Sequence, residues 1–559
     1  MNRLTLRHLR LIPTLGLVAA IFVAGCSGKV EQPASDGSAQ GQGNDGAAPA
    51  QPVRGGTVTI GYPSDIDGVN ELIHGSAQQT RHVIEQMFVK LLAEQADYQS
   101  HPPTFEPRLA ESYEYSEDRT VITFHLRRDA VWSDGEPITA DDVRWTWQAQ
   151  INPAVAWDNV VMKASITDVE VVDPYTVRYH FTHAYPGQLV HINEGAVLPR
   201  HAWGKLPFSE WRSSGTWFVD HLVVSGPFKL ASWKPQQEIV LERNERYYEP
   251  GIPYLDRVVF RIIPDPITQY NEFRSGSIDY LRQVPAGNAA QIASDPRLRL
   301  MAYWPPAYCA VVWNLRRPQF SDPAVRRALT MSIDRQAIVD TLWYGYAKPV
   351  ESPVISSVWG YDDTIKPWPY DPAAARQILD EQGWKVKEGG VRERDGVKFA
   401  FDLIVNSGNH ERKNAMEMIQ QQLKQVGVQA RPRTLDWNTV GAKLESRDFD
   451  ATIIVLGIET SLDFSASFHS RAAANELNYS GYSNPEVDAL LDDARRQKRL
   501  EDTVPFLHRF QEILHQDQPL TMLWESQRLV GLSRRIQGAK PNPISAFEDL
   551  RYWWLLPER

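Results

Sequence analysis

Two pairs of neighbouring carboxylates are the side chains most suited to acid–base chemistry in this chain. They are Asp141 with Asp142, and Asp492 with Asp493. A glycoside hydrolase needs two carboxylates that face one another across a sugar bond. Both pairs fall in segments with helical periodicity, where successive side chains point about 100° apart. Neither pair is therefore predicted to form a catalytic site.

Other catalytic templates fail as well. Cys309 lies in an apolar stretch that is predicted to be a strand, with no helix start beside it to lower its pKa. Residues 410–414, HERKN, lack the second histidine that a zinc protease needs at the fifth position. The sequence contains no GxSxG nucleophile elbow and no Walker A loop. We expect no enzymatic activity, no metal site and no cofactor.

Cys26 is the residue whose context points to a covalent modification. It follows Val23, Ala24 and Gly25, and the preceding residues 11–24 are apolar behind a basic head. This stretch is too short for a stable membrane span and is typical of a secretory signal. The pattern resembles a lipoprotein lipobox, which implies cleavage before Cys26 and acylation of its sulfur.

The next residues are predicted to be a flexible tether. Residues 27–55 are rich in Gly, Ser, Ala, Gln and Pro and show no apolar periodicity. With Cys26 acylated, Cys309 is the only other cysteine, so no disulfide forms within one mature chain. The protein must instead be stabilised by a large core, and its length suggests more than one lobe. A net charge of -10, without a Lys/Arg block, argues against nucleic acid as a partner.

The remaining chain alternates strand and helix patterns, which indicates an α/β protein. Helices are expected near residues 80–92 and after Thr139, where the threonine can cap and Asp141 and Asp142 suit a helix start. Period-two alternation predicts strands at 57–62, 121–126, 176–181 and, in a block, over 228–263. Apolar residues every three or four positions predict helices at 322–342, 410–426 and 484–500.

Six segments, in the same order along the chain, resemble the family 5 extracellular solute-binding proteins, which are the peptide-binding lipoproteins of ABC importers. The segments are residues 109–147, SGPFKLASWKP at 225–235, residues 239–265, SDPAVRRALTMSIDRQAIV at 321–339, FHS at 468–470 and YSGYSNPEVDALL at 479–491. The resemblance implies an α/β, two-lobed, periplasmic-binding-protein-like clamp of type II with an additional small domain and mixed sheets flanked by helices.

The resemblance also implies a domain division. The signal peptide would be residues 1–25 and the lipidated tether 26–55. Lobe I would combine residues 56–93, 219–305 and 515–559. The additional small domain would be 94–218, and lobe II would be 306–514. Ligand would select the closed state by touching both lobes.

The implied function is capture of a peptide or peptide-like solute and its delivery to the permease and ATPase subunits of an ABC importer. The protein is expected to be a monomer, periplasmic or on the cell surface, and in contact with the membrane only through its lipid. Two alternatives remain open from the sequence: a sensory receptor that uses the same clamp, and a cell-surface hydrolase. The identity and length of the ligand stay open too.

Aromatic side chains at strand ends are the candidates for the pocket walls. Tyr308 and Trp313 would face opposite sides of one strand, so at most one of them faces the cleft. Trp437 follows a predicted strand and resembles a family position that lines the second lobe.

Dipeptide-binding members of the family hold the ligand's ammonium with an aspartate and its carboxylate with an arginine. The aspartate position falls near Gly457 and Glu459, and the arginine position near Asn406, so neither anchor is present in the family form. A free dipeptide is therefore a poor candidate ligand, because a buried carboxylate without a partner is costly. Glu459 or Asp463 could instead hold a cation, and Asn406 with Asn409 could offer amide contacts.

Overall fold

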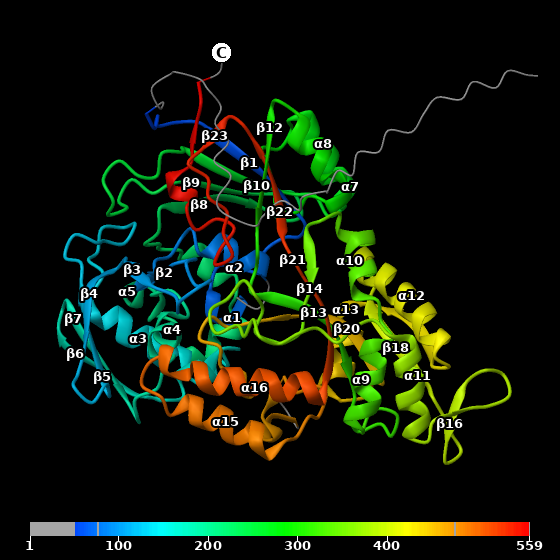
Figure 1. The fold of residues 1–559 in the computed structure, drawn as a ribbon. Coiled ribbons are helices and arrows are strands. Elements are labelled where there is room, and N and C mark those ends of the chain that lie inside the picture. Colours follow the sequence, from blue (N-terminus) through cyan, green and yellow to red (C-terminus); the bar gives the residue numbers. More distant parts are fainter. Residues whose placement is uncertain (1–50, 75–77, 474–476, 558–559) are drawn as a thin grey trace, which may run out of the picture. The chain divides into compact units, whose positions relative to one another are not determined.

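The computed structural model describes residues 51–74, 78–473 and 477–557. The predicted signal peptide, Cys26 and almost all of the predicted tether lie outside the described residues. Within the described chain, strands gather mainly in three mixed or antiparallel sheets (Figure 1). None of the helices in these described ranges combines the length and apolar character needed to span a bilayer.

The first sheet has the strand order β12-β22-β11-β1-β10-β9-β8. β1 is parallel to both β10 and β11, whereas the outer pairs are antiparallel. The alternating burial of Val58, Ile60 and Tyr62 on β1 follows the predicted period of two. The strands are β1 Thr57–Tyr62, β8 Phe228–Lys234, β9 Glu238–Arg243, β10 Arg257–Ile262, β11 Tyr280–Leu281, β12 Leu298–Tyr303 and β22 Arg528–Ser533.

The second sheet has the order β14-β21-β13-β20-β18-β19. Its strands are β13 Ala307–Trp313, β14 Ala347–Pro349, β18 Ala400–Asn406, β19 Gln429–Leu435, β20 Ala451–Gly457 and β21 Leu520–Ser526. Helices cover both faces of this sheet, and β13 accordingly has apolar side chains on both sides. Trp313 packs in one core with α9, α10, α11 and α12. Tyr308 packs in another core with α13, α15 and α16. These helices are α9 Pro323–Met331, α10 Arg335–Trp343, α11 Pro372–Glu381, α12 His410–Gln425, α13 Trp437–Glu445, α15 Pro485–Arg495 and α16 Val504–Asp517.

A third, antiparallel sheet, β4-β5-β7-β6, packs against α3. Asp142 lies in the first turn of α3, as predicted, and its carboxylate accepts the Thr139 N–H at 2.9 Å. These elements are β4 Ala110–Tyr115, β5 Val121–Leu126, α3 Ala140–Gln150, β6 Ile166–Asp173 and β7 Thr176–Phe181.

Shorter elements join the three sheets. They are α1 Glu71–His74, α2 Gln78–Ile84, β2 Leu92–Glu94, β3 Phe105–Pro107, η1 Val160–Lys163, α4 Gln188–Asn193, α5 Arg200–Trp203, η2 Phe208–Ser213, α6 Trp217–Asp220, α7 Pro266–Ser275, η3 Ala286–Asn288, α8 Ala289–Ser294, β15 Lys385–Val386, β16 Arg392–Arg394, β17 Val397–Lys398, α14 Ser465–Phe468, η4 Ser470–Ala473, η5 Glu501–Thr503, β23 Ile536–Gln537, η6 Leu550–Tyr552 and β24 Trp554–Leu555.

Three predicted helices differ from the structure. The helix expected over residues 484–500 is α15, which ends five residues earlier, at Arg495. The helix expected over residues 80–92 ends at Ile84, and the chain turns before it enters β2. The single helix expected over residues 322–342 is divided into α9 and α10. The break occurs because the Asp334 side chain accepts the Ala337 N–H at 2.9 Å and starts a new helix.

The chain passes between the two larger sheets at two places in its second half. The first passage is residues 304–306, between β12 and β13, and the second is Gln527, between β21 and β22. Placing residues 515–526 in lobe I does not fit this pairing, because β21 pairs with β13 and leaves the second sheet only after Ser526. The passage therefore lies about ten residues later than expected.

Candidate functional site

A cavity of about 440 Å³ lies where these two passages meet. Its lining comes from β13, β20, β21, α10 and the start of α12 on the side of the second sheet. On the side of the first sheet it comes from β22, α2 and the loop leading to η3. A ligand here would touch both sheets beside the two connecting segments, which is the location expected for a hinge-bound solute.

The walls of this cavity combine polar side chains with apolar and aromatic ones. Tyr308 and Trp524 are each only 3% exposed, and Trp343 lines the cavity from the end of α10. Pro305 and Pro306 add a rigid apolar edge. Flat, rigid surfaces of this kind bury the apolar parts of a ligand without losing much side-chain entropy.

Two arginines project into the cavity from elements that hold them in place. Arg412 is the third residue of α12, whose first turn is fixed because the Asn409 side chain accepts the Arg412 N–H at 2.7 Å. Arg528 is the first residue of β22, directly after the passage between the sheets, and its Nη1 donates to Gln283 Oε1 at 2.5 Å.

These arginines have few partners. Arg412 Nε is buried without a hydrogen-bond acceptor, and among the described residues no carboxylate forms an ion pair with Arg412 or Arg528. Burial lowers the pKa of both guanidinium groups, although arginine remains protonated at neutral pH. Burial also raises the pKa of the neighbouring Cys309 thiol to about 12, so the thiol is neutral.

Two of the residues predicted as ligand contacts line this cavity: Tyr308 and Asn409. Three others do not. Asn406 ends β18 with its Oδ1 buried and unpartnered, Trp437 is 55% exposed at the start of α13, and Gly457 ends β20 at the surface. The structure thus separates Trp437 from Tyr308, although both were expected to form pocket walls.

The two predicted acidic contacts already have protein partners. Glu459 Oε1 lies 3.2 Å from His191 Nε2 and accepts the Ser461 hydroxyl at 2.7 Å. Asp463 accepts the Ser465 N–H at 2.9 Å and lies beside a separate cavity of about 110 Å³. Their predicted role as a ligand's cation site stays a prediction.

The sequence reasoning did not identify Arg412, Arg528, Trp343 or Trp524. Arg412 belongs to the HERKN segment, which was weighed only as a metal motif. For Arg528 and Trp524 the sequence gives only a weak indication of a site. Both lie in WESQR, where an apolar strand pattern gives way to polar residues, as at the start of a loop. In the described ranges, no group of three or more His, Cys, Asp or Glu residues is placed to hold a metal ion.

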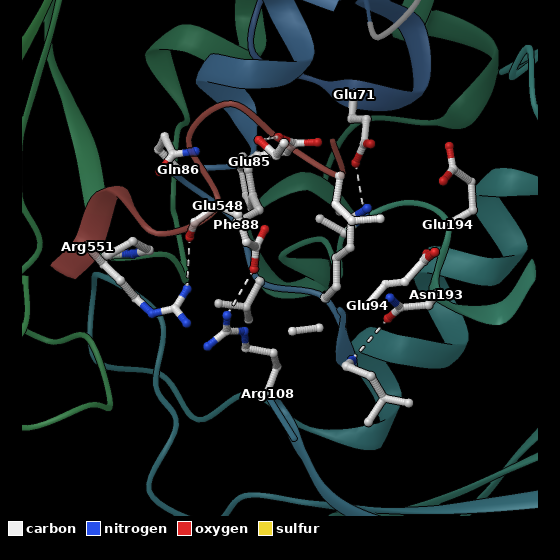
Figure 2. A pocket seen from close by; sticks show the side chains of 18 of the residues that line it. Glu71, Glu85, Gln86, Phe88, Glu94, Arg108, Asn193, Glu194, Glu548 and Arg551 are labelled. Carbon is white, nitrogen blue, oxygen red and sulfur yellow. Dashed lines mark hydrogen bonds and ion pairs between the residues drawn. The ribbon is translucent and has the colours of Figure 1, made fainter. Parts of the chain in front are cut away.

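A further cavity, of about 110 Å³, is lined by many ionisable side chains (Figure 2). Glu85, Glu94 and Glu194 face it together with Arg108 and Arg551. Burial raises the pKa of Glu85 to about 7, an effect that Lys90 opposes and Glu548 reinforces.

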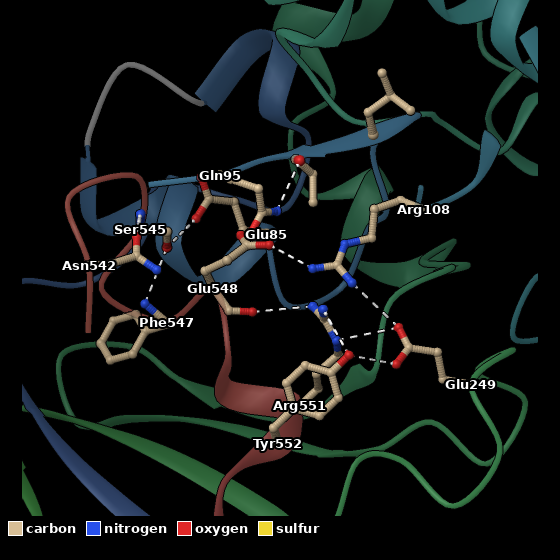
Figure 3. A network of polar contacts seen from close by, with 12 residues as sticks. Glu85, Gln95, Arg108, Glu249, Asn542, Ser545, Phe547, Glu548, Arg551 and Tyr552 are labelled. Carbon is tan, nitrogen blue, oxygen red and sulfur yellow. Dashed lines mark hydrogen bonds and ion pairs between the residues drawn. The ribbon is translucent and has the colours of Figure 1, made fainter. Parts of the chain in front are cut away.

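The guanidinium groups of Arg108 and Arg551, beside the cavity that Glu85 lines, are paired with carboxylates (Figure 3). Arg108 Nη2 lies 2.9 Å from Glu548 Oε1, and Arg108 Nη1 lies 3.5 Å from Glu249 Oε1. Arg551 shares the same Glu249 carboxylate at 3.4 Å, and Tyr552 donates to it at 3.0 Å. The network joins the C-terminal segment to the end of β3, so its geometry indicates a structural role.

Comparison with known proteins adds to this geometry. The family model described as "Bacterial extracellular solute-binding proteins, family 5 Middle" matches residues 104–475. The oligopeptide-binding protein AppA of Bacillus subtilis is 27% identical over 96% of this chain and 97% of its own. The heme-binding protein A of Haemophilus influenzae is 26% identical over 78% of this chain and 82% of its own.

A solved structure of the Bacillus subtilis AppA in complex with a nonapeptide superposes with a TM-score of 0.79. It is 26% identical to this chain, and the match covers 90% of this chain and all of that one. The predicted fold class is therefore confirmed. One of these relatives is named for oligopeptides and the other for heme, so the ligands of the relatives differ in chemistry.

Proposed function

Because the chain belongs to family 5 of the bacterial extracellular solute-binding proteins, we propose that it captures a peptide or peptide-like solute outside the cytoplasm and delivers it to an ABC importer. The predicted family is confirmed, and with it a solute-binding role. The similarity to an oligopeptide-binding protein over nearly the full length supports peptides as the solute class.

The observation that carries the proposal is the position of the 440 Å³ cavity. It lies at the two passages between the sheets and is lined from both sides. A solute bound there contacts both halves at once, so binding favours the arrangement in which the halves are close. An importer can recognise that arrangement, whereas a cavity within one half would give no such signal.

We further propose that Cys26 is acylated and holds the protein at the membrane, which the residues before it support. Replacing Cys26→Ser should move the protein from the membrane fraction to the soluble extracytoplasmic fraction, as measured by fractionation and immunoblotting. A variant that stays in the membrane fraction would contradict the anchor without affecting the proposed solute.

Binding is tested by incubating the purified protein with an equimolar mixture of random-sequence peptides of four to nine residues. Native mass spectrometry should show intact peptide retained at one per protein. The melting temperature should rise, because a ligand that binds only the folded state stabilises it. Release of cleaved peptides would instead support the hydrolase alternative.

A matched pair of variants locates the site. Ala286→Trp should fill the main cavity and reduce peptide retention at least about tenfold. Ala164→Trp should fill the separate cavity beside Asp463 and leave retention unchanged. Equal retention by both variants, or retention of no peptide by the unaltered protein, contradicts the proposed function.

A further inference from the structure

The loop between β2 and β3, residues 95–104, reaches from the half of the protein built on the first sheet into the half built on the second. Leu91 and Leu92, just before the loop, pack in the same core as β1 and β10. Tyr98, within the loop, lies in a core of the second sheet, where it is only 2% exposed. The other buried residues described in that core all lie between Tyr308 and Met522. The loop therefore inserts one aromatic side chain from the first half into the second.

Hydrogen bonds within the loop hold it in shape for this insertion. Asp97 accepts the Thr104 N–H at 3.2 Å and the Thr104 hydroxyl at 2.5 Å. The Gln95 N–H donates to the Thr104 carbonyl at 2.8 Å, so the two ends of the loop are paired. Pro102 and Pro103 restrict the backbone further. A preformed loop loses little conformational entropy when it docks, so more of its contact free energy holds the halves together.

Polar contacts join the inserted tyrosine to the second half. The Tyr98 carbonyl accepts the Trp359 backbone N–H at 2.8 Å. The Trp359 indole Nε1 donates to the Thr460 carbonyl at 2.9 Å, and the Thr460 hydroxyl donates to Glu94 Oε1 at 2.5 Å. Tyr98 and Glu94 from the first half thus form one connected set of contacts, the Tyr98 bridge, with Trp359 and Thr460 from the second half.

A further contact between the halves lies next to this bridge in the sequence. His191 Nε2, on α4, is 3.2 Å from Oε1 of Glu459, the residue before Thr460. Among the lining residues described for the main cavity are neither the four bridge residues nor His191 and Glu459. The bridge can therefore influence a solute in the main cavity only through the positions of the two halves.

The hydroxyl of Tyr98 is buried without a hydrogen-bond partner among the described residues. Such a group costs free energy while it is buried, whereas water supplies a partner once the side chain is withdrawn. Burial of the aromatic ring favours insertion, and burial of the hydroxyl opposes it. A tyrosine in this position holds the halves together reversibly, as a clamp that has to release its solute requires.

We propose that the Tyr98 bridge is a latch that stabilises the closed arrangement of the two halves and thereby sets how tightly the main cavity retains its solute. The effect on retention rests on the proposed function, whereas the effect on closure concerns the protein without peptide. When only a fraction of the protein is in the binding-competent arrangement, the apparent dissociation constant rises by the reciprocal of that fraction. Residues that do not touch the solute therefore contribute to its affinity.

The test uses two measurements on the purified protein. Small-angle X-ray scattering gives the radius of gyration without peptide, and native mass spectrometry gives the concentration of random-sequence peptides at half-maximal retention. Tyr98→Ala should increase the radius of gyration and raise this concentration at least about fivefold, because the closed arrangement loses the inserted ring. Tyr98→Phe keeps the ring and removes the unpartnered hydroxyl, so both values should equal or fall below those of the unaltered protein.

A matched pair of variants tests the polar part of the bridge. Thr460→Val removes the hydroxyl that donates to Glu94 and should shift both values in the same direction as Tyr98→Ala, by a smaller amount. Thr460→Ser keeps the hydroxyl and should behave as the unaltered protein. Tyr370→Ala changes a tyrosine of the second half that is 42% exposed, and it should alter neither value.

An unchanged radius of gyration in Tyr98→Ala would overturn the inference, even with a lower melting temperature, because Tyr98 would then serve only the packing of the second half. Equal values for Thr460→Val and Thr460→Ser would overturn the polar part of the bridge, and they can be compared even if Tyr98→Ala does not fold. If the unaltered protein retains no peptide, the proposed function is wrong, and the radius of gyration still decides whether the bridge holds the halves together.

Discussion

Arg108 and Arg412 both lie beside cavities, but their guanidinium groups differ in ion-pair partners and in the direction of their pKa shifts. Arg108 is 12% exposed and pairs with Glu548 and Glu249. Burial is the largest single influence on the pKa of Arg108 and lowers it, but Glu548 together with Tyr247 and Tyr248 raises it by more. Arg412 has no such partner among the described residues, and burial lowers its pKa.

The difference separates structural charge from charge available to a ligand. In the network of Arg108, Arg551, Glu249 and Glu548, each guanidinium is paired with a carboxylate, so removing one arginine leaves partly buried carboxylates with fewer partners. In the main cavity, Arg412 and Arg528 form no ion pair with a carboxylate of the residues that the structure describes, so removing either leaves no such carboxylate without its partner. Removing an arginine charge should therefore have opposite effects on stability in the two regions.

The largest effect is expected for Arg108→Ala. It leaves the Glu548 and Glu249 carboxylates partly buried with fewer partners. We expect the free energy of unfolding, measured by urea denaturation, to fall by about 4 kcal/mol. Arg297→Ala, which removes an exposed arginine paired with Asp295, should leave it nearly unchanged, because water and salt screen a pair at the surface. Comparable losses in the two variants would remove the distinction between the network and an ordinary surface pair.

A smaller effect should depend on pH. The folded-state pKa of Glu85 is raised to about 7 from an ordinary value of 4.5, mainly by burial. Between these values the unfolded chain loses the proton and the folded chain keeps it. The Glu85 contribution is therefore fully present below about pH 4.5 and is lost as the pH rises to about 7.

Glu85→Gln cannot ionise, so its stability relative to the unaltered protein should increase by about 2 kcal/mol between pH 5 and pH 7. Urea denaturation at several pH values measures this difference. The hydroxyl of Ser545 still has an amide oxygen to donate to in the variant. A difference that stays constant over this range would show that Glu85 is ionised in the folded protein.

The smallest effect is expected for Arg412→Met, and it has the opposite sign. Methionine keeps most of the apolar length and removes a charge that has no protein partner. Without peptide present, the free energy of unfolding should rise by about 1 kcal/mol. A loss of stability of the size expected for Arg108→Ala would show that Arg412 has an unrecognised structural partner.

Local patterns predicted most of the regular elements. The period-two segments at residues 57–62, 121–126 and 176–181 are β1, β5 and β7, because alternating burial is a property of the strand itself. The helix at residues 80–92 was wrong beyond Ile84, since the apolar residues after it pack in the core without continuing the helix. The division between α9 and α10 was not predicted, because it depends on a single residue, Asp334, whose side chain caps the start of α10.

The candidate site could be predicted less well. Tyr308 was identified from its place on an apolar strand, and Asn409 from its neighbourhood in the sequence, and both line the main cavity. Trp437 was an equally reasonable candidate by residue type, but the start of α13 leaves it 55% exposed. Residue type alone does not reveal which end of a helix faces a cavity.

The amino-acid sequence by itself determined the class of protein, because six family segments and the strand and helix periods are spread along the whole chain. Only the tertiary structure decided which arginines are paired with carboxylates and which line a cavity without such a partner among the described residues. Arg412 and Arg528 are 116 residues apart in sequence, and the passage from β21 to β22 places them at one cavity. Whether a charge is paired depends on such long-range contacts, which no local pattern encodes.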